Sequence, residues 1–266
     1  MGQAGAVCGI THNRSQAAVN GHNVPIVYDA GGAGQSPSPA SDEGERVVLP
    51  YLLLAGIRKL DAVILTHPHR DHVGGMPAVL RETQVGLLLD PQIPCDEPRY
   101  AEMLTVAAQR SIPTRPARAG QRLSLGREAV LEVLWPAGAP VRGTADDVNN
   151  NSVVARVSYG NFRALLTGDV QEETERMLVG SGTPLQSTLL KLPHHGSKTS
   201  SSSAFLDAVR PEVAVATCGG GTEGGVDDTI RARLAAVGCA LYRTDRDGAV
   251  TVVSDGTGYR VHCFAH

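Results

Sequence analysis

Four side chains that can bind a metal ion lie within six residues of this sequence: His67, His69, Asp71 and His72. Pro68 restricts the backbone around it, which disfavours a helix through the segment and favours a tight loop. Imidazole nitrogens and carboxylate oxygens hold zinc at about 2.0–2.2 Å, so a zinc site requires ligands clustered as densely as these. Three of the nine histidines fall in this short segment. The segment therefore indicates a metal site rather than a surface loop that happens to contain histidine.

Three further candidate ligands lie far along the chain. Asp169 follows an apolar stretch at 163–166, and His194 and His195 follow another at 188–192. Alone, a Gly-Asp pair at a strand end is commonly a turn or a helix cap. Together with the first segment, these residues indicate a site for two cations about 3.5–4 Å apart, held by ligands from distant parts of the chain. The sequence leaves open which of His194 and His195 is the ligand.

Alternating strand-like and helix-like segments with short connections must position these side chains. Strands are expected at 24–28, 62–65, 85–89, 130–134, 153–159, 163–166, 188–192, 213–217, 240–242 and 250–253, and helices at 45–56, 77–83, 97–110, 171–178, 204–209 and 229–237. The candidate ligands directly follow strands, as does Asp29, and strand ends are where a rigid sheet presents site residues on loops. Gly74 and Gly75 are expected to let the chain turn sharply after the first ligand segment. The pattern predicts sheets covered by helices on their outer faces, in one domain over residues 1–266.

The order of these motifs resembles the metallo-β-lactamase superfamily: H-x-H-x-D-H after a strand, then T-G-D, then a late His at a strand end. Within it, the sequence is most similar to the hydrolase domain of the competence DNA-internalisation (ComEC) proteins. Four blocks in the same order carry this similarity: RVVLPYLLLAGIRKLDAVILTHPHRDHVGG, NNNSVVARVSYGNFRALLTGD, LLKLPHHGSKTSSSSAFLDAVRPEVAVATCG and LYRTDRDGAVTV.

The resemblance implies an α/β fold, the αββα sandwich of the metallo-β-lactamase fold, with a dinuclear site at one edge of its two sheets. It implies two divalent metal ions, Zn²⁺ and/or Mn²⁺, bridged by Asp169. The implied ligands are His67, His69, Asp71, His72, Asp169 and one of His194 and His195, with His195 preferred. Asp71, Asp169 and His195 are then the expected catalytic residues.

The sequence departs from the family pattern at several places. The usual third His, ahead of the strand before T-G-D, is missing, and DDVNNN at 146–151 occupies its position. The opening V-G-Q-G-D-A of this branch is present only as MGQAGA, with Gly5 in place of the Asp, which implies a truncated first strand. A later N-x-Y-G-H-P segment is replaced by TEGGVD at 222–227.

Because the third His is missing, the two metal positions are expected to differ in their ligands and in their affinity. The resemblance implies that one cation is bound by Asp71, His72, Asp169 and His195. The other is then bound only by His67, His69 and Asp169. An Asn carbonyl or a water within 146–151 is a weaker zinc ligand than imidazole, and oxygen donors favour Mn²⁺ or Mg²⁺. We therefore expect one tightly held ion and a second, more open position that Mn²⁺ fills.

Composition excludes several other classes. The chain has 266 residues, 42% of them hydrophobic, and a net charge of −3, so no global positive field draws it to nucleic acid or membrane. Five scattered cysteines without a C-x-x-C spacing predict free thiols rather than disulfides or a thiolate metal site. The longest apolar runs fall short of the roughly 18–20 residues that span a bilayer. No charged and then apolar N-terminal pattern is present, so a cytoplasmic location is the default expectation.

The function expected first is a metal-dependent phosphodiesterase or nuclease that acts on DNA or a related small phosphodiester. Two cations polarise phosphoryl oxygens and lower the pKa of a bridging water towards about 7, which supplies hydroxide at neutral pH. Ser197 and Lys198 are expected to bind the phosphate. The serines at 200–203 are expected either to donate hydrogen bonds to it or to lead into a helix cap. The same ligands also suit a β-lactam or lactone hydrolase, and a non-catalytic relative that binds DNA or a partner is a third alternative.

Overall fold

The central strands are apolar on both sides, so each sheet has to be covered on both faces. In β5 (Ala62–Ile64), Ala62 and Ile64 pack between the two sheets of the molecule, whereas Val63 packs against helices. β14 (Val213–Ala216) alternates in the same way between the shared core and a second helical layer. Two sheets with apolar contacts on all four faces form the predicted αββα sandwich, which is confirmed.

The computed structural model describes residues 6–10, 16–21, 24–31, 42–126, 128–218 and 225–264. Within these residues the first sheet contains, in spatial order, β17 (Tyr259–Phe264), β16 (Ala249–Ser254), β1 (Ala6–Ile10), β2 (Gln16–Gly21), β3 (Val24–Ala30), β5, β7 (Leu88–Asp90) and β8 (Thr114–Pro116). The second contains β15 (Ala240–Arg243), β14, β13 (Leu189–Lys191), β12 (Phe162–Leu166), β11 (Val154–Tyr159), β10 (Ala129–Trp135) and β9 (Arg122–Leu125). A short pair, β4 (Lys59–Leu60) and β6 (Gln84–Val85), lies outside both.

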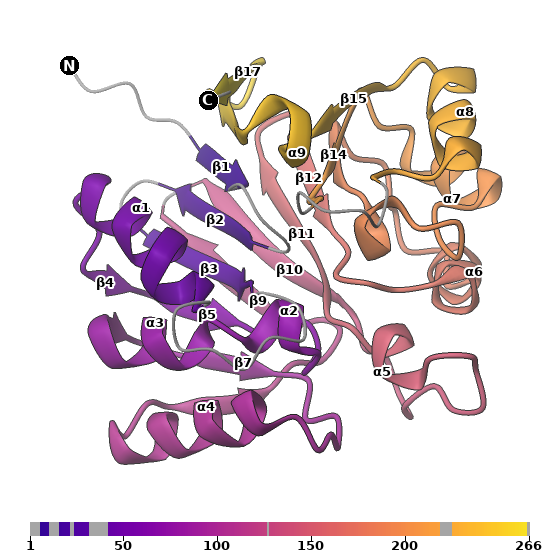
Figure 1. The fold of residues 1–266 in the computed structure, drawn as a ribbon. Coiled ribbons are helices and arrows are strands. Elements are labelled where there is room, and N and C mark those ends of the chain that lie inside the picture. Colours follow the sequence, from indigo (N-terminus) through magenta and orange to yellow (C-terminus); the bar gives the residue numbers. More distant parts are fainter. Residues whose placement is uncertain are drawn as a thin grey trace.

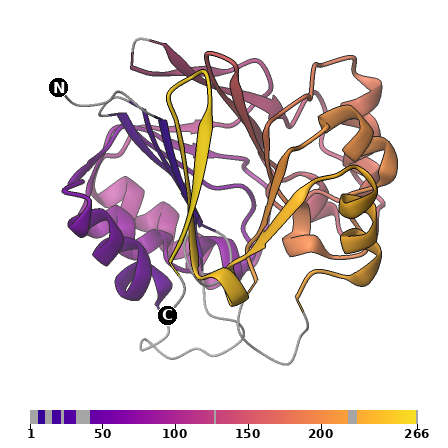
Figure 2. The same cartoon turned by 90° about the horizontal axis from the view of Figure 1, so that it is seen from above.

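Helices cover the outer face of each sheet (Figures 1 and 2). The first helical layer consists of the π-helical turn η2 (Gly44–Val48), α1 (Leu49–Leu54), α2 (Arg70–Val73), α3 (Met76–Glu82) and α4 (Pro98–Gln109). The second consists of α6 (Glu172–Gly180), α7 (Ser203–Val209) and α8 (Asp228–Ala236). The short helices α5 (Asp147–Asn150), η3 (Pro193–Gly196) and α9 (Thr244–Asp247) lie in the connections between strands.

Most predicted elements are present, with two corrections. The single strand expected at 85–89 is divided into β6, which pairs with β4, and β7, which pairs with β5 in the first sheet. Gly86 lies between them against the carbonyl oxygen of Asp61, where a Cβ atom would be only 2.8 Å away. The helix expected at 45–56 begins as the π-helical turn η2 before it continues as α1. The truncation expected at residues 1–5 and the first half of the substituted segment at 222–227 lie outside the described residues.

The topology brings the ends of several strands to one edge of the sandwich. β3 runs parallel to β5, and β12 runs parallel to β13 and β14, so their carboxyl ends lie together within each sheet. The segments that follow these strands contain the predicted ligands. The fold therefore gathers residues that are more than 100 positions apart in sequence. Among the described helices, none is long and apolar enough to cross a bilayer.

Candidate metal centre

The first ligand segment follows β5 directly and is held in place by buried surroundings. Leu65, Thr66 and His67 are fully buried, and His69 has an extended backbone that precedes α2. The predicted loop is therefore present at His67–Pro68–His69, but Asp71 and His72 lie on the helical turn that follows it. Neither Gly74 nor Gly75 has a positive φ, and α3 begins directly after them at Met76. Gly75 is required for space, because a Cβ there would collide with the backbone of Ala30 and Gly44.

Four of the predicted ligands form one tight cluster. One ligand atom from each of Asp71, His72, Asp169 and His195 lies within 4.8 Å of all the others. Oδ2 of Asp169 lies 3.1 Å from Nε2 of His72 and 3.2 Å from Nε2 of His195. Oδ2 of Asp71 lies 3.3 Å from the same nitrogen of His195. Two imidazole nitrogens and two carboxylates that converge in this way are a donor set that fits a divalent cation such as zinc.

In both His72 and His195, Nδ1 donates a hydrogen bond outside the cluster, which directs Nε2 into it. Nδ1 of His72 donates to Oδ2 of Asp29 at 2.8 Å, and Nδ1 of His195 donates to the carbonyl oxygen of Thr217 at 2.8 Å. Asp29 also accepts from the backbone N–H and the hydroxyl of Thr66, both at 2.8 Å. Such outer hydrogen bonds set the tautomer and orientation of metal-binding histidines. The sequence placed Asp29 at a strand end, but only the structure assigns it this positioning role.

The electrostatics show how strongly the cluster requires positive charge. Burial alone lowers the pKa of His72, but the carboxylates of Asp169, Asp29 and Asp71 outweigh it and raise that pKa to about 10. Burial likewise opposes the charge of Asp169, yet His195, His72 and Lys191 hold its pKa well below the usual value. In the metal-free protein, protonated imidazoles thus supply the charge that the carboxylates require. Metal ions and protons compete for such positions.

The two histidines of the late pair are placed differently. Both have a left-handed backbone, with φ of 47° for His194 and 56° for His195, a conformation that costs energy for non-glycine residues and marks constrained sites. This bend directs His195 into the cluster. Nδ1 of His194 instead lies 2.9 Å from Oγ1 of Thr199. The structure thus places His195, the preferred residue of the pair, in the cluster and His194 beside it.

His67 and His69 lie next to the four-residue cluster. Their ring centroids are 4.8 Å apart, and the ring of His67 lies 4.0 Å from that of His72. Because Thr66 donates its hydroxyl proton to Asp29, its oxygen accepts from Nδ1 of His67 at 2.9 Å, which leaves Nε2 of His67 with a free lone pair. Burial lowers the pKa of His67 well below its usual value, so the ring is neutral. This Nε2 is buried and has no hydrogen-bond partner among the described residues, which fits a second cation.

Lys191 is a neighbour of the cluster that the sequence did not single out. Its side chain is only 3% exposed, and Nζ lies 3.6 Å from Oδ1 of Asp169. Nζ also donates to the carbonyl oxygens of Gly168 and Leu192 at 3.2 and 3.3 Å. The available signal was a lysine inside the apolar stretch 188–192, where a buried charge requires a partner.

A groove of about 760 Å³ opens onto the cluster. Asp71 and His195 line it, together with Ser197, Lys198, Arg231 and Arg243. Arg231 is paired with Asp228 and Arg243 with Asp245. Lys198 has no carboxylate within ion-pairing distance in the part of the chain that the structure describes. It is therefore the groove cation best able to meet an anionic ligand.

Of the serines at 200–203, two are enclosed and one caps a helix. Ser200 and Ser201 are buried, and the hydroxyl of Ser200 donates to the carbonyl oxygen of Val170. Ser202 accepts from the N–H of Phe205 and caps α7. The helix-cap interpretation is thus confirmed, and the phosphate-donor interpretation of Ser200 and Ser201 is wrong because both side chains are enclosed.

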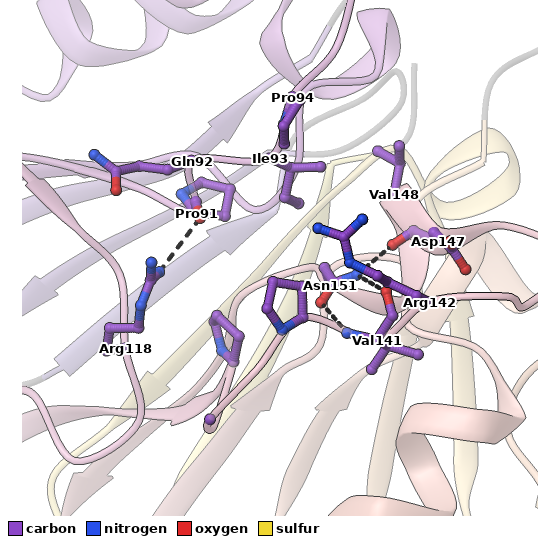
Figure 3. Close-up of a pocket in the computed structure, with 13 residues that line it drawn as sticks. Pro91, Gln92, Ile93, Pro94, Arg118, Val141, Arg142, Asp147, Val148 and Asn151 are labelled. Carbon is purple, nitrogen blue, oxygen red and sulfur yellow. Dashed lines mark hydrogen bonds between the residues drawn. The ribbon is translucent and has the colours of Figure 1, made fainter.

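A second cavity, of about 260 Å³, lies between the segment after β7 and the segment that leads into α5 (Figure 3). Arg118 lines one side, where its guanidinium donates to the carbonyl oxygen of Pro91. Arg142, Val148 and Asn151 line the other side (Figure 3). None of the predicted site residues lines this cavity.

The sandwich and its clustered Asp and His side chains define the class of protein. The sequence model described as the Metallo-beta-lactamase superfamily matches residues 15–220, so the chain belongs to this superfamily, as predicted. It has a metallo-hydrolase fold with a candidate divalent-metal site.

Among curated relatives, the chain is similar to ComE operon protein 3 of Bacillus subtilis, with 31% identity over 66% of this chain and 22% of the relative. It is 36% identical to competence protein ComA of Neisseria gonorrhoeae, over 76% of this chain and 26% of that protein. These relatives confirm the predicted resemblance to competence proteins. The chain spans about a quarter of the length of the curated relatives it matches.

Solved structures share the fold at low sequence identity. Igni18, described as a novel metallo hydrolase from Ignicoccus hospitalis, has a TM-score of 0.57 at 17% identity, covering 92% of this chain and 98% of its own. The metallo-beta-lactamase fold protein YhfI from Bacillus subtilis has a TM-score of 0.59 at 13% identity, covering 94% of this chain and all of its own. At such identities the likeness concerns the fold alone.

Proposed function

We propose that this protein is a metal-dependent phosphodiesterase that uses two divalent cations and acts on DNA or a related phosphodiester. The observation that carries the proposal is the cluster of Asp71, His72, Asp169 and His195 at the base of a groove lined by Lys198. The names of the relatives fit a DNA substrate, since they include competence proteins and recombination protein 2 of Haemophilus influenzae, which is 31% identical over 73% of this chain.

The burial of the four clustered residues indicates the direction of substrate approach. The side chains of Asp71 and His195 are 24% and 20% exposed, whereas that of His72 is fully buried and that of Asp169 only 4% exposed. A ligand therefore reaches the cluster over Asp71 and His195, from the groove. Lys198 and Ser197 lie along that approach and can donate hydrogen bonds to phosphate oxygens.

Asp169 is the residue that can serve two cations at once. Its Oδ2 belongs to the four-residue cluster, while its buried Oδ1 accepts no hydrogen bond in the described structure. His67 and His69 would complete the second position, with the free Nε2 of His67 as one ligand atom. When bound, two such cations polarise phosphoryl oxygens and lower the pKa of water so that it can attack at neutral pH.

The test is a comparison of substrates on protein reconstituted with Zn²⁺ or Mn²⁺. Hydrolysis of bis-p-nitrophenyl phosphate, single-stranded DNA and nitrocefin would be measured side by side, with the metal-free protein as blank. We expect turnover of the two phosphodiesters with a higher kcat/KM than for nitrocefin. A higher kcat/KM for nitrocefin would establish a β-lactam hydrolase instead, and no turnover of any substrate by metal-loaded protein would contradict an enzymatic role.

A further inference from the structure

Residues 146–151 occupy the position of the family's third histidine, and the residues that follow them contact the loops that contain the candidate ligands. The carbonyl oxygen of Asn149 accepts from the N–H of Ser152 at 2.9 Å, which folds this end of α5 back on itself. The hydroxyl of Ser152 accepts from the N–H of Asp169 at 3.2 Å, and the N–H of Val153 donates to the carbonyl oxygen of Thr66 at 2.9 Å. The turn that contains Asn149 thus lies against both ligand-bearing loops.

Of the three consecutive asparagines in this turn, two have structural roles. Oδ1 of Asn150 accepts from the N–H of Gln171 at 3.0 Å, and its Nδ2 donates to Oγ1 of Thr144 at 3.1 Å. Oδ1 of Asn151 accepts from the N–H of Val141 at 2.9 Å, and its Nδ2 donates to the carbonyl oxygen of the same residue. Both amides are thus satisfied by neighbouring backbone and side-chain groups.

Asn149 differs from its two neighbours. The residue is only 3% exposed and its side-chain oxygen is buried. This oxygen nevertheless accepts no hydrogen bond from the described residues. Asn149 does not line the cavity of Figure 3, so its side-chain oxygen cannot find a water partner there. The residues of this turn that line the cavity are Asp147, Val148 and Asn151. A buried amide oxygen without a donor indicates a missing partner such as an ion.

Two other buried atoms in the linked segments also accept no hydrogen bond. They are Nε2 of His67 and Oδ1 of Asp169, the latter with Nζ of Lys191 3.6 Å away. Each of the three atoms has a free lone pair, and each belongs to a segment linked to the other two by the hydrogen bonds of Ser152 and Val153. A cation can accept lone pairs from several such atoms at once, whereas a hydrogen-bond donor satisfies them one at a time.

We propose that Oδ1 of Asn149 is a protein ligand of the second cation, in the position that the superfamily gives to a histidine. This inference rests on the proposed two-cation function and specifies which residue completes the His67–His69 site. An amide oxygen is a harder donor than imidazole, so the substitution shifts the preference of this position from Zn²⁺ towards Mn²⁺. The four-residue cluster, with two imidazoles, keeps its preference for zinc.

Titration of metal-free protein with Mn²⁺, followed by electron paramagnetic resonance and calorimetry, tests this assignment without an activity readout. Wild type should bind two ions, one tightly and one weakly. Asn149→Leu should weaken the second site by at least about tenfold, since even the loss of an outer hydrogen-bond partner costs that much. Its first site should be unchanged, and the stability of the metal-free protein should not fall. Asn151→Ala, in the same turn but facing the cavity, should lose stability and keep both sites.

A second variant keeps the assignment testable if Asn149→Leu does not fold. Asn149→His should raise the Zn²⁺ affinity of the second site and reduce its preference for Mn²⁺, since imidazole is the better zinc ligand. An unchanged second-site affinity in Asn149→Leu, or an unchanged metal preference in Asn149→His, would refute the role of Asn149 alone. Binding of fewer than two ions by wild type would contradict the two-cation function itself.

Discussion

Replacement of Asp29 by asparagine tests whether the outer hydrogen bonds of the cluster control metal affinity. Asp29 is 1% exposed and accepts three hydrogen bonds of 2.8 Å, one from the His72 imidazole and two from Thr66. Asparagine has nearly the same shape, but it is uncharged and turns one acceptor into a donor. Loss of such an outer partner commonly weakens metal binding about 10–100-fold, which corresponds to about 1.4–2.7 kcal/mol. The loss of charge-assisted hydrogen bonds should also lower the unfolding free energy of the metal-free protein by about 2–4 kcal/mol.

Asp90 provides the matched control for this experiment. It ends β7, is 2% exposed and accepts hydrogen bonds from the hydroxyl of Tyr100 and the N–H of Gln92, but none from the cluster. Asp90→Asn should therefore lower stability by about 1–2 kcal/mol and leave metal affinity unchanged. Calorimetric titration with Zn²⁺ and urea unfolding of both variants supply the two quantities. Equal metal affinities in wild type and Asp29→Asn would refute the argument that Asp29 orients His72 for binding.

Four further outcomes follow from the same geometry. Asp169→Ala should leave less than about 1% of wild-type turnover in a protein that circular dichroism shows to be folded, because a ligand shared by both cations is removed. His195→Ala should weaken metal binding at least about tenfold while His194→Ala does not, as measured by calorimetry; equal losses would contradict the placement of the pair. Lys198→Ala should lower kcat/KM for a phosphodiester about tenfold, the low end for a charge-assisted hydrogen bond, and Lys198→Arg should restore most of it. The pKa of His72 is raised from 6.5 to about 10, so its contribution to metal-free stability is complete below about pH 6.5 and is lost as the pH rises towards 10; urea unfolding that shows no such decline would contradict the charge state assigned to His72.

Much of the fold was predictable because its central strands are short apolar runs that end in polar clusters. The stretch 62–65 predicted β5, and the histidines and aspartate after it lie at the predicted sheet edge. The missed elements lack that signal. β8 (Thr114–Pro116) is exposed throughout, β9 (Arg122–Leu125) buries only its last residue, and α5 spans four mostly polar residues that no apolar periodicity could reveal.

The candidate site was predictable in its residue types but not in its supporting contacts. Histidine and aspartate density indicated His67, His69, Asp71 and His72, because ligands for one ion must be close together. The pairing of Asp29 with His72 joins residues 43 positions apart, and nothing local in the sequence specifies it. The burial of Ser200 and Ser201 could not be predicted either, since a serine run is typical of both an exposed loop and a helix cap.

Anomalous X-ray diffraction from crystals grown with Mn²⁺ and Zn²⁺ would locate the metal ions of this protein directly. We expect two metal peaks. One should lie among Asp71, His72, Asp169 and His195, and the other beside His67 and His69, with Asp169 contacting both. A single peak among the four clustered residues would contradict the two-cation site. Metal bound elsewhere, with the hydrogen bonds of the cluster intact, would show that these four residues are not a metal site.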